Sequence, residues 1–102
     1  MKVHEITEHN FHEDVLNSVR PVLLDFWAPW CGPCNMLSPV LEEIAGERPD
    51  IKVCKVNVDA QRTLASQYKV YRIPTLLIMD QGQEEDRITG VRPKDELLSM
   101  FV

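Results

Sequence analysis

A nearly continuous apolar segment, "PVLLDFWA" (21–28), constrains the fold more than any other feature of the chain. A strand has this composition when both of its faces are covered, because both sets of alternating side chains are then buried. The next segment, from Cys34 to about Glu47, has apolar residues at helical spacing, namely Leu37, Val40, Leu41, Ile44 and Ala45. A β-branched segment, "IKVCKVNV" (51–58), then predicts another strand. A strand, a helix and a strand in this order predict a parallel β-α-β unit.

The remaining segments extend this pattern on both sides. A strand is predicted over "VHEI" (3–6), and a helix over "NFHEDVLNS", where Asn10 and Glu13 have the spacing of a capping box. A short capped helix is predicted over "DAQRTLASQY" (59–68). The strands "PTLLIMD" and "EEDRITG" form a hairpin around "DQGQ", and "RPKDELLSMFV" forms a final helix. We therefore predict a single α/β domain over 1–102, with a mixed sheet covered by helices on both faces.

Composition excludes several classes of partner. The net charge is −5, and acidic and basic residues are interspersed. Nucleic acids and anionic membranes select basic patches, so neither is an expected partner. The apolar segments are too short to span a bilayer. The first residues, "MKVHEITEHNF", lack the apolar region of a signal peptide, so we expect a cytoplasmic protein.

The segment "WCGPC" (30–34) allows three interpretations of its cysteine pair. A structural disulfide is disfavoured, because closing so short a loop constrains the unfolded chain very little. A zinc site needs four ligands and this pair supplies two. The other candidate ligands are scattered singly, namely Cys54, His4, His9 and His12. Redox chemistry is the favoured interpretation.

The position of the pair gives this chemistry a physical reason. Cys31 falls at or just before a helix N-terminus, and Cys34 lies one turn into the helix. Gly32 would allow a sharp turn, and Pro33 suits the first helical turn. The positive end of the helix dipole favours a thiolate at Cys31, and a thiolate is the attacking group in disulfide exchange.

Asp25 interrupts the apolar strand and shares one of its faces with Leu23 and Trp27. Burial disfavours the charged form, so its pKa is expected to be raised. One hypothesis is a structural acid paired with a backbone donor or with Lys55. The hypothesis we favour is a base that deprotonates Cys34, directly or through water.

Five further positions have simpler interpretations. Pro39 is expected to kink its helix, and Pro74 to begin a strand. Cys54 is expected to be a small buried apolar side chain. Trp27 and Trp30 are either core residues or the aromatic lining of a docking surface.

The segments "VLLDFWAPWCGPC", "KVNVD", "YRIPTLLIMDQGQ" and "ITGVRPKDEL" resemble the thioredoxin family in order and spacing. The resemblance implies a central sheet of about five strands flanked by about four helices. It implies a protein-disulfide reductase in which Cys31 attacks a target disulfide and Cys34 resolves the mixed disulfide. No cofactor would be bound. A partner thioredoxin reductase using NADPH would restore the dithiol of this monomer.

The resemblance also assigns roles around the pair. Pro74 would match the family's cis-proline, and the backbone of Ile73 would pair with the substrate. Trp30, Gly32, Pro33, Gly90 and Val91 would complete the docking surface, while Asp25 and Lys55 match the family's buried acid and its neighbouring lysine. Gly-Pro between the cysteines is similar to the reducing members. Tyr71 and Arg72 depart from the family pattern, and the bulky cation could narrow the range of targets or favour acidic ones.

Two alternatives to a reductase stay open from the sequence. The chain could be a docking subunit whose redox chemistry is incidental, although an intact CGPC with Asp25 and Pro74 disfavours this. An oxidase or isomerase is disfavoured by the Gly-Pro pair and by the missing export signal.

Overall fold

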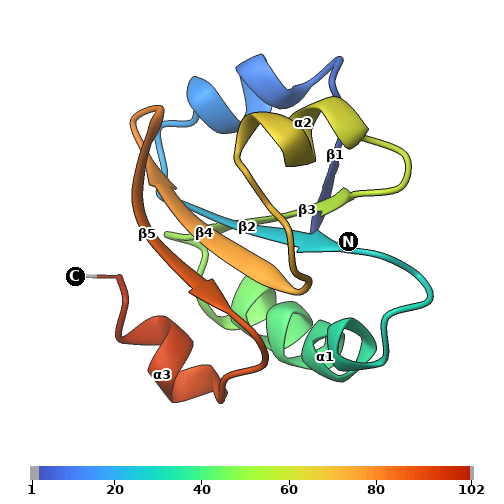
Figure 1. Ribbon diagram of the computed structural model, residues 1–102. Coiled ribbons are helices and arrows are strands. Elements are labelled where there is room, and N and C mark those ends of the chain that lie inside the picture. Colours follow the sequence, from blue (N-terminus) through green and yellow to red (C-terminus); the bar gives the residue numbers. More distant parts are fainter. Residues whose placement is uncertain (1–2, 102) are drawn as a thin grey trace.

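A computed structural model describes residues 3–101, and its centre is a five-stranded mixed sheet (Figure 1). The strands are β1 (His4–Ile6), β2 (Val22–Trp27), β3 (Lys52–Asn57), β4 (Thr75–Asp80) and β5 (Gln83–Thr89), in the order β1-β3-β2-β4-β5. Both β1 and β2 pair with β3 in parallel, whereas β4 is antiparallel to β2 and to β5. The predicted parallel unit and the antiparallel hairpin edge are confirmed.

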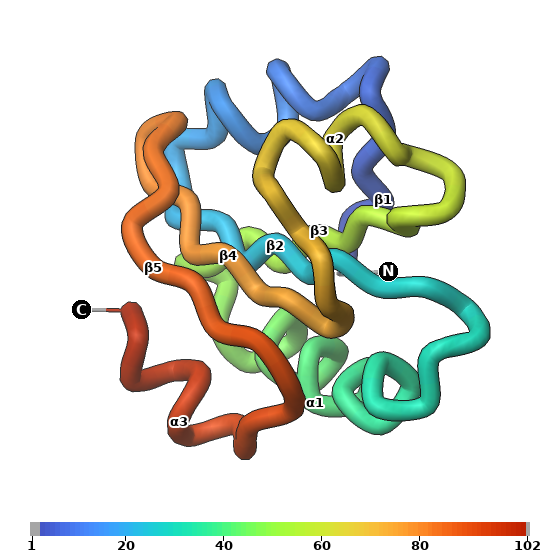
Figure 2. The backbone as a smooth tube through the Cα atoms, in the orientation of Figure 1, coloured from blue at the N-terminus to red at the C-terminus, as the bar shows by residue number. Residues whose placement is uncertain are grey.

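Four helical segments cover the sheet in the described part of the chain: η1 (His12–Leu16, a π-helical turn), α1 (Gly32–Glu47), α2 (Arg62–Gln67) and α3 (Lys94–Leu98). Helices α1 and α3 lie against one face, and η1 and α2 against the other (Figures 1 and 2). None of these helices has the length and apolar character needed to cross a membrane.

Strand β2 is buried on both faces because it contributes to two separate cores. Leu24 and Phe26 pack in the core beneath η1 and α2, whereas Leu23 packs in the core beneath α1 and α3. This explains the continuous apolar segment in the sequence. Alternation along the strand places Asp25 on the α1 face, beside Leu23.

The hairpin between β4 and β5 has the backbone expected from its sequence. Gln81 and Gly82 both adopt positive φ, at 51° and 80°. Two such residues form the tight turn that matches the twist of paired strands.

Helix α1 runs without interruption from Gly32 to Glu47, with Pro39 inside it.

The predicted capping box at the first helix is wrong. The helix cap is Phe11, and no side chain caps that end. The Asn10 side chain instead accepts a hydrogen bond from the Thr7 backbone N–H at 2.7 Å and donates one to the Glu5 carbonyl at 3.0 Å. Asn10 therefore stabilises the preceding turn, a local bond that competes with helix capping.

The helix predicted over 59–68 begins later than expected and has no side-chain cap. The side-chain amide oxygen of Asn57, Oδ1, accepts hydrogen bonds from the backbone N–H groups of Asp59 and Ala60, at 2.9 and 3.3 Å. This closes a turn before the helix. The regular helix therefore starts at Arg62.

Cys54 is a buried apolar residue, as predicted. Its side chain is fully buried in β3, within the core under η1 and α2. Burial raises the pKa of the thiol to about 12, so it stays protonated at neutral pH.

Candidate active site

Cys31 and Cys34 form a disulfide at the start of α1. The turn that leads from β2 is closed by a bond from the Cys31 N–H to the Ala28 carbonyl, at 3.1 Å. Cys31 is the cap residue of α1, and its Sγ accepts the Cys34 backbone N–H at 3.2 Å. The sulfur thus occupies the place that an oxygen fills in an ordinary helix cap. After reduction, this N–H and the helix dipole would stabilise a thiolate there.

Three segments far apart in the sequence meet around the sulfur atoms. Both cysteines are buried and pack with Ala28, and Trp27, Val58 and Ile73 lie against them. The Ile73 carbonyl oxygen lies 3.9 Å from Cys31 Sγ, and the bond from Ile73 to Pro74 is cis. The Gly90 N–H donates to the Pro74 carbonyl at 2.9 Å. The loops predicted to flank the pair are therefore brought together.

Of the two residues between the cysteines, Pro33 agrees with its predicted role and Gly32 does not. Pro33 lies in the first turn of α1, as predicted. Gly32 does not adopt positive φ, and an added Cβ would meet no atom within 4 Å. The sharp turn therefore does not require glycine. Gly90, by contrast, has φ of 98°, which favours glycine.

An exposed apolar surface surrounds this site. Trp30 is 70% exposed, Met36 70% and Tyr71 84%, and Val91 is also exposed. The core alternative for Trp30 is thus wrong, and its indole N–H donates to the Asp59 carboxylate at 2.7 Å. Sequence analysis missed Asp59 and Met36. Met36 could have been noticed because it lies off the apolar stripe of α1.

Asp25 is an almost fully buried carboxyl group, 3% exposed. Within residues 3–101, its Oδ1 atom has no hydrogen-bond partner. Burial raises the pKa of this carboxyl to about 7, although the positive charge of Lys55 acts in the opposite direction. The predicted rise in pKa is confirmed.

Lys55 does not form an ion pair with Asp25 in the described structure. The two residues are register neighbours on β2 and β3. The Lys55 Nζ instead lies 4.6 Å from the centroid of the Trp27 ring, in a cation–π contact. Lys55 therefore contacts the Trp27 ring, although its charge still acts on the Asp25 carboxyl, and the structural and the base hypotheses for Asp25 both stay predictions.

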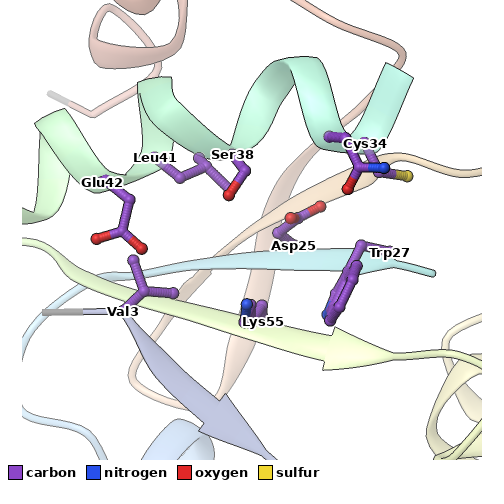
Figure 3. A pocket seen from close by; sticks show the side chains of 9 residues that line it. Val3, Asp25, Trp27, Cys34, Ser38, Leu41, Glu42 and Lys55 are labelled. Atoms are coloured by element: carbon purple, nitrogen blue, oxygen red, sulfur yellow. The ribbon is translucent and has the colours of Figure 1, made fainter. Parts of the chain in front are cut away.

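A small cavity joins Asp25 to Cys34. Its volume is about 30 Å³, and the side chains of α1 point into it from above Asp25 (Figure 3). Its polar lining includes Ser38, Glu42 and Lys55. A polar cavity of this size can hold about one water molecule. Ser38 and Glu42 follow Cys34 at intervals of four residues, and this helical spacing could have predicted them.

Nothing in the described residues resembles a metal centre. No group of three or more His, Cys, Asp or Glu side chains within 3–101 is arranged to hold an ion. The three histidines are exposed on the surface.

A cysteine pair closed as a disulfide at a helix N-terminus, beside a buried acid, is the site of a thiol–disulfide oxidoreductase. The family model described as Thioredoxin matches residues 2–102. The chain belongs to the thioredoxin family, whose members are disulfide oxidoreductases.

Named relatives agree with this family. The chain is 48% identical over 100 residues to a thioredoxin from Pyropia yezoensis, covering 97% of this chain and 94% of the relative. It is 50% identical over 93 residues to thioredoxin 1 from Synechococcus elongatus, covering 90% and 87%. A bifunctional thioredoxin reductase/thioredoxin from Mycobacterium leprae is 48% identical over 95 residues, covering 92% of this chain and 21% of that protein.

Proposed function

We propose that this chain is a protein-disulfide reductase in which Cys31 is the nucleophile and Cys34 the resolving thiol. The observation that carries the proposal is the cap geometry, in which Cys31 Sγ accepts the Cys34 N–H at a helix N-terminus. Only Cys31 has this stabilisation for a thiolate. Cys34 lies one turn further in and beside the cavity of Asp25.

The electrons and protons balance over two exchange steps. The Cys31 thiolate attacks one sulfur of a target disulfide, which breaks the target bond and releases a thiolate that takes up a proton. Cys34 then loses its proton to Asp25 and attacks Cys31 Sγ. This attack releases the second target thiolate and closes the Cys31–Cys34 disulfide. Two electrons have passed to the target.

The surface around the pair would hold the target during both steps. The backbone of Ile73 would pair with an extended segment of the target, next to Cys31 Sγ. Trp30 and Val91 would supply apolar contact, and Gly90 would fix the loop against Pro74. Gly32 and Pro33 are exposed between the two cysteines and would contact the target.

A separate reductase would regenerate the dithiol. The Mycobacterium leprae relative joins a thioredoxin reductase and a thioredoxin in one chain, which supports a functional pairing of the two activities. NADPH would be used by that reductase, and this chain would need no bound cofactor of its own. Its disulfide alone carries the electrons.

Redox titration tests this function against the alternatives. The protein is equilibrated in graded dithiothreitol buffers while Trp27 and Trp30 fluorescence is followed. We expect a two-electron transition below the cytosolic glutathione poise of about −220 to −260 mV. A transition at or above that poise would support an oxidase or isomerase. The absence of any transition would leave a docking subunit.

Asp25 is proposed as the proton acceptor for Cys34. Its pKa of about 7 suits proton transfer near neutral pH. We expect Asp25→Asn to slow the resolution of a mixed disulfide by at least about tenfold at pH 7, since general base catalysis contributes 10²-fold or more. Quenched-flow trapping of the mixed disulfide measures this rate. An unchanged rate would remove Asp25 from the mechanism.

A further inference from the structure

A second pocket lies beside the docking surface, on the opposite side of the sheet from the Asp25 cavity. Its volume is about 210 Å³, and it is lined by Lys69, Tyr71, Arg72, Thr75, Arg87 and Thr89. Three of these six side chains are cationic, in a chain that carries 16 acidic and only 11 basic residues. The pocket is therefore lined by positive side chains, although the net charge of the whole chain is negative.

The Arg87 side chain on one side of this pocket is held by several hydrogen bonds. Its guanidinium forms two hydrogen bonds with the Glu84 carboxylate, at 2.7 and 3.0 Å. It also donates to the backbone carbonyls of Tyr68 and Lys69, at 2.7 and 3.4 Å. The charge of Arg87 is thus largely neutralised by Glu84, and its role is to hold the backbone that presents Lys69.

Lys69 and Arg72 are the cations left available to a ligand. Both are exposed, and neither forms an ion pair with any residue in 3–101. Lys69 has φ of 55°, a left-handed conformation that fixes its direction from the turn. The Thr75 hydroxyl donates to the backbone carbonyl of Arg72 at 2.5 Å, which fixes the backbone from which the Arg72 side chain extends.

The position of Arg72 connects this pocket to the reactive sulfur. Arg72 directly precedes Ile73, so the two Cα atoms are about 3.8 Å apart. The Ile73 carbonyl lies 3.9 Å from Cys31 Sγ. An extended segment docked at Ile73 would therefore bring residues near its cysteine within reach of Arg72 and Lys69.

We propose that this pocket, which we call the Lys69/Arg72 pocket, selects target disulfides that are flanked by aspartate or glutamate. The inference rests on the reductase function proposed above and names a substrate class for it. Two unpaired cations would attract carboxylates and speed encounter, in the manner of complementary charges at an interface. Tyr71, 84% exposed, adds an apolar wall.

Two disulfide-bonded peptides test the inference. They are identical except that the residues flanking both cysteines are Asp and Glu in one and Asn and Gln in the other. Oxidation of the reduced protein by each peptide is followed by stopped-flow tryptophan fluorescence. We expect the acidic peptide to react about fivefold faster in about 20 mM salt, and this ratio to fall below about twofold in about 500 mM salt, because salt screens exposed charges.

Variants assign the effect to the pocket. Combining Lys69→Asn with Arg72→Gln should bring the ratio close to one, and asparagine suits the left-handed backbone at position 69. Arg72→Glu should reverse the preference. Arg20→Gln is the matched control, since Arg20 lies before β2, at the end of that strand remote from Cys31, and should keep the wild-type ratio.

The outcomes separate this inference from the proposed function. Equal rates for the two peptides, or a preference that persists in the double variant, would show that the Lys69/Arg72 pocket does not select acidic targets. Either result would leave the proposed reductase function standing. Failure of both peptides to oxidise the wild-type dithiol would overturn the reductase function, and the inference with it.

Discussion

Cys31→Ser is expected to reduce insulin no faster than the uncatalysed background, whereas Cys34→Ser is expected to accumulate a one-to-one covalent complex with its target. Serine at position 31 would remove the proposed nucleophile at the helix N-terminus. Serine at position 34 leaves the first attack intact but removes the thiol that releases the target. Insulin turbidity measures the first effect, and non-reducing electrophoresis followed by mass spectrometry measures the second.

Cys54→Ala is the matched control for these two variants. Cys54 is fully buried in β3 and is not among the residues around the disulfide. Its replacement should leave turnover at the wild-type rate. Turnover by the Cys31→Ser protein, or a covalent complex that forms through Cys54, would contradict the assigned roles.

Asp25→Asn is expected to stabilise the oxidised protein at pH 8 by about 4 kcal/mol more than at pH 3. The pKa of Asp25 rises from 3.8 in the unfolded chain to about 7 in the folded protein. Between these values the folded state holds a proton that the unfolded state has lost, so stability falls as pH rises. Each pKa unit contributes about 1.4 kcal/mol, and the shift is about three units. Asparagine does not ionise, so the variant would not lose this part of its unfolding free energy as the pH rises.

Urea unfolding across this pH range measures the effect. The difference in unfolding free energy between variant and wild type should be constant below about pH 3, grow between about pH 4 and pH 7, and level off above about pH 8. Asp86→Asn, at an exposed position of β5, is the control and should show little change with pH. A difference that does not vary with pH would show that Asp25 is not a buried titrating acid.

Much of the fold could be predicted because its main elements have strong local patterns. The apolar composition of β2, the helical stripe of α1 and the Gln81–Gly82 turn each admit few alternatives. The start of the first helix was missed because the Asn10 side chain has two local uses. It can cap a helix or close a turn, and only the packed structure shows that it closes the turn with Thr7.

The candidate site was predicted unevenly for a similar reason. Cys31 and Cys34 could be placed at a helix start from their neighbours in the sequence. The contact between Lys55 and the Trp27 ring could not be predicted from the sequence. Whether Lys55 contacts Asp25 or that ring depends on side-chain directions across two strands. The bond from Trp30 to Asp59 likewise joins residues that only the sheet brings together.

The hydrogen bond between Gly90 and Pro74 bears on how the surface around the cysteine pair is assembled. The cysteine pair at 31–34 occupies one turn of helix, but the proposed target surface also includes Ile73 and the 90–91 loop. This bond joins the loop after β5 to the start of β4, so the proposed target surface is complete only where the two strands of the hairpin are paired.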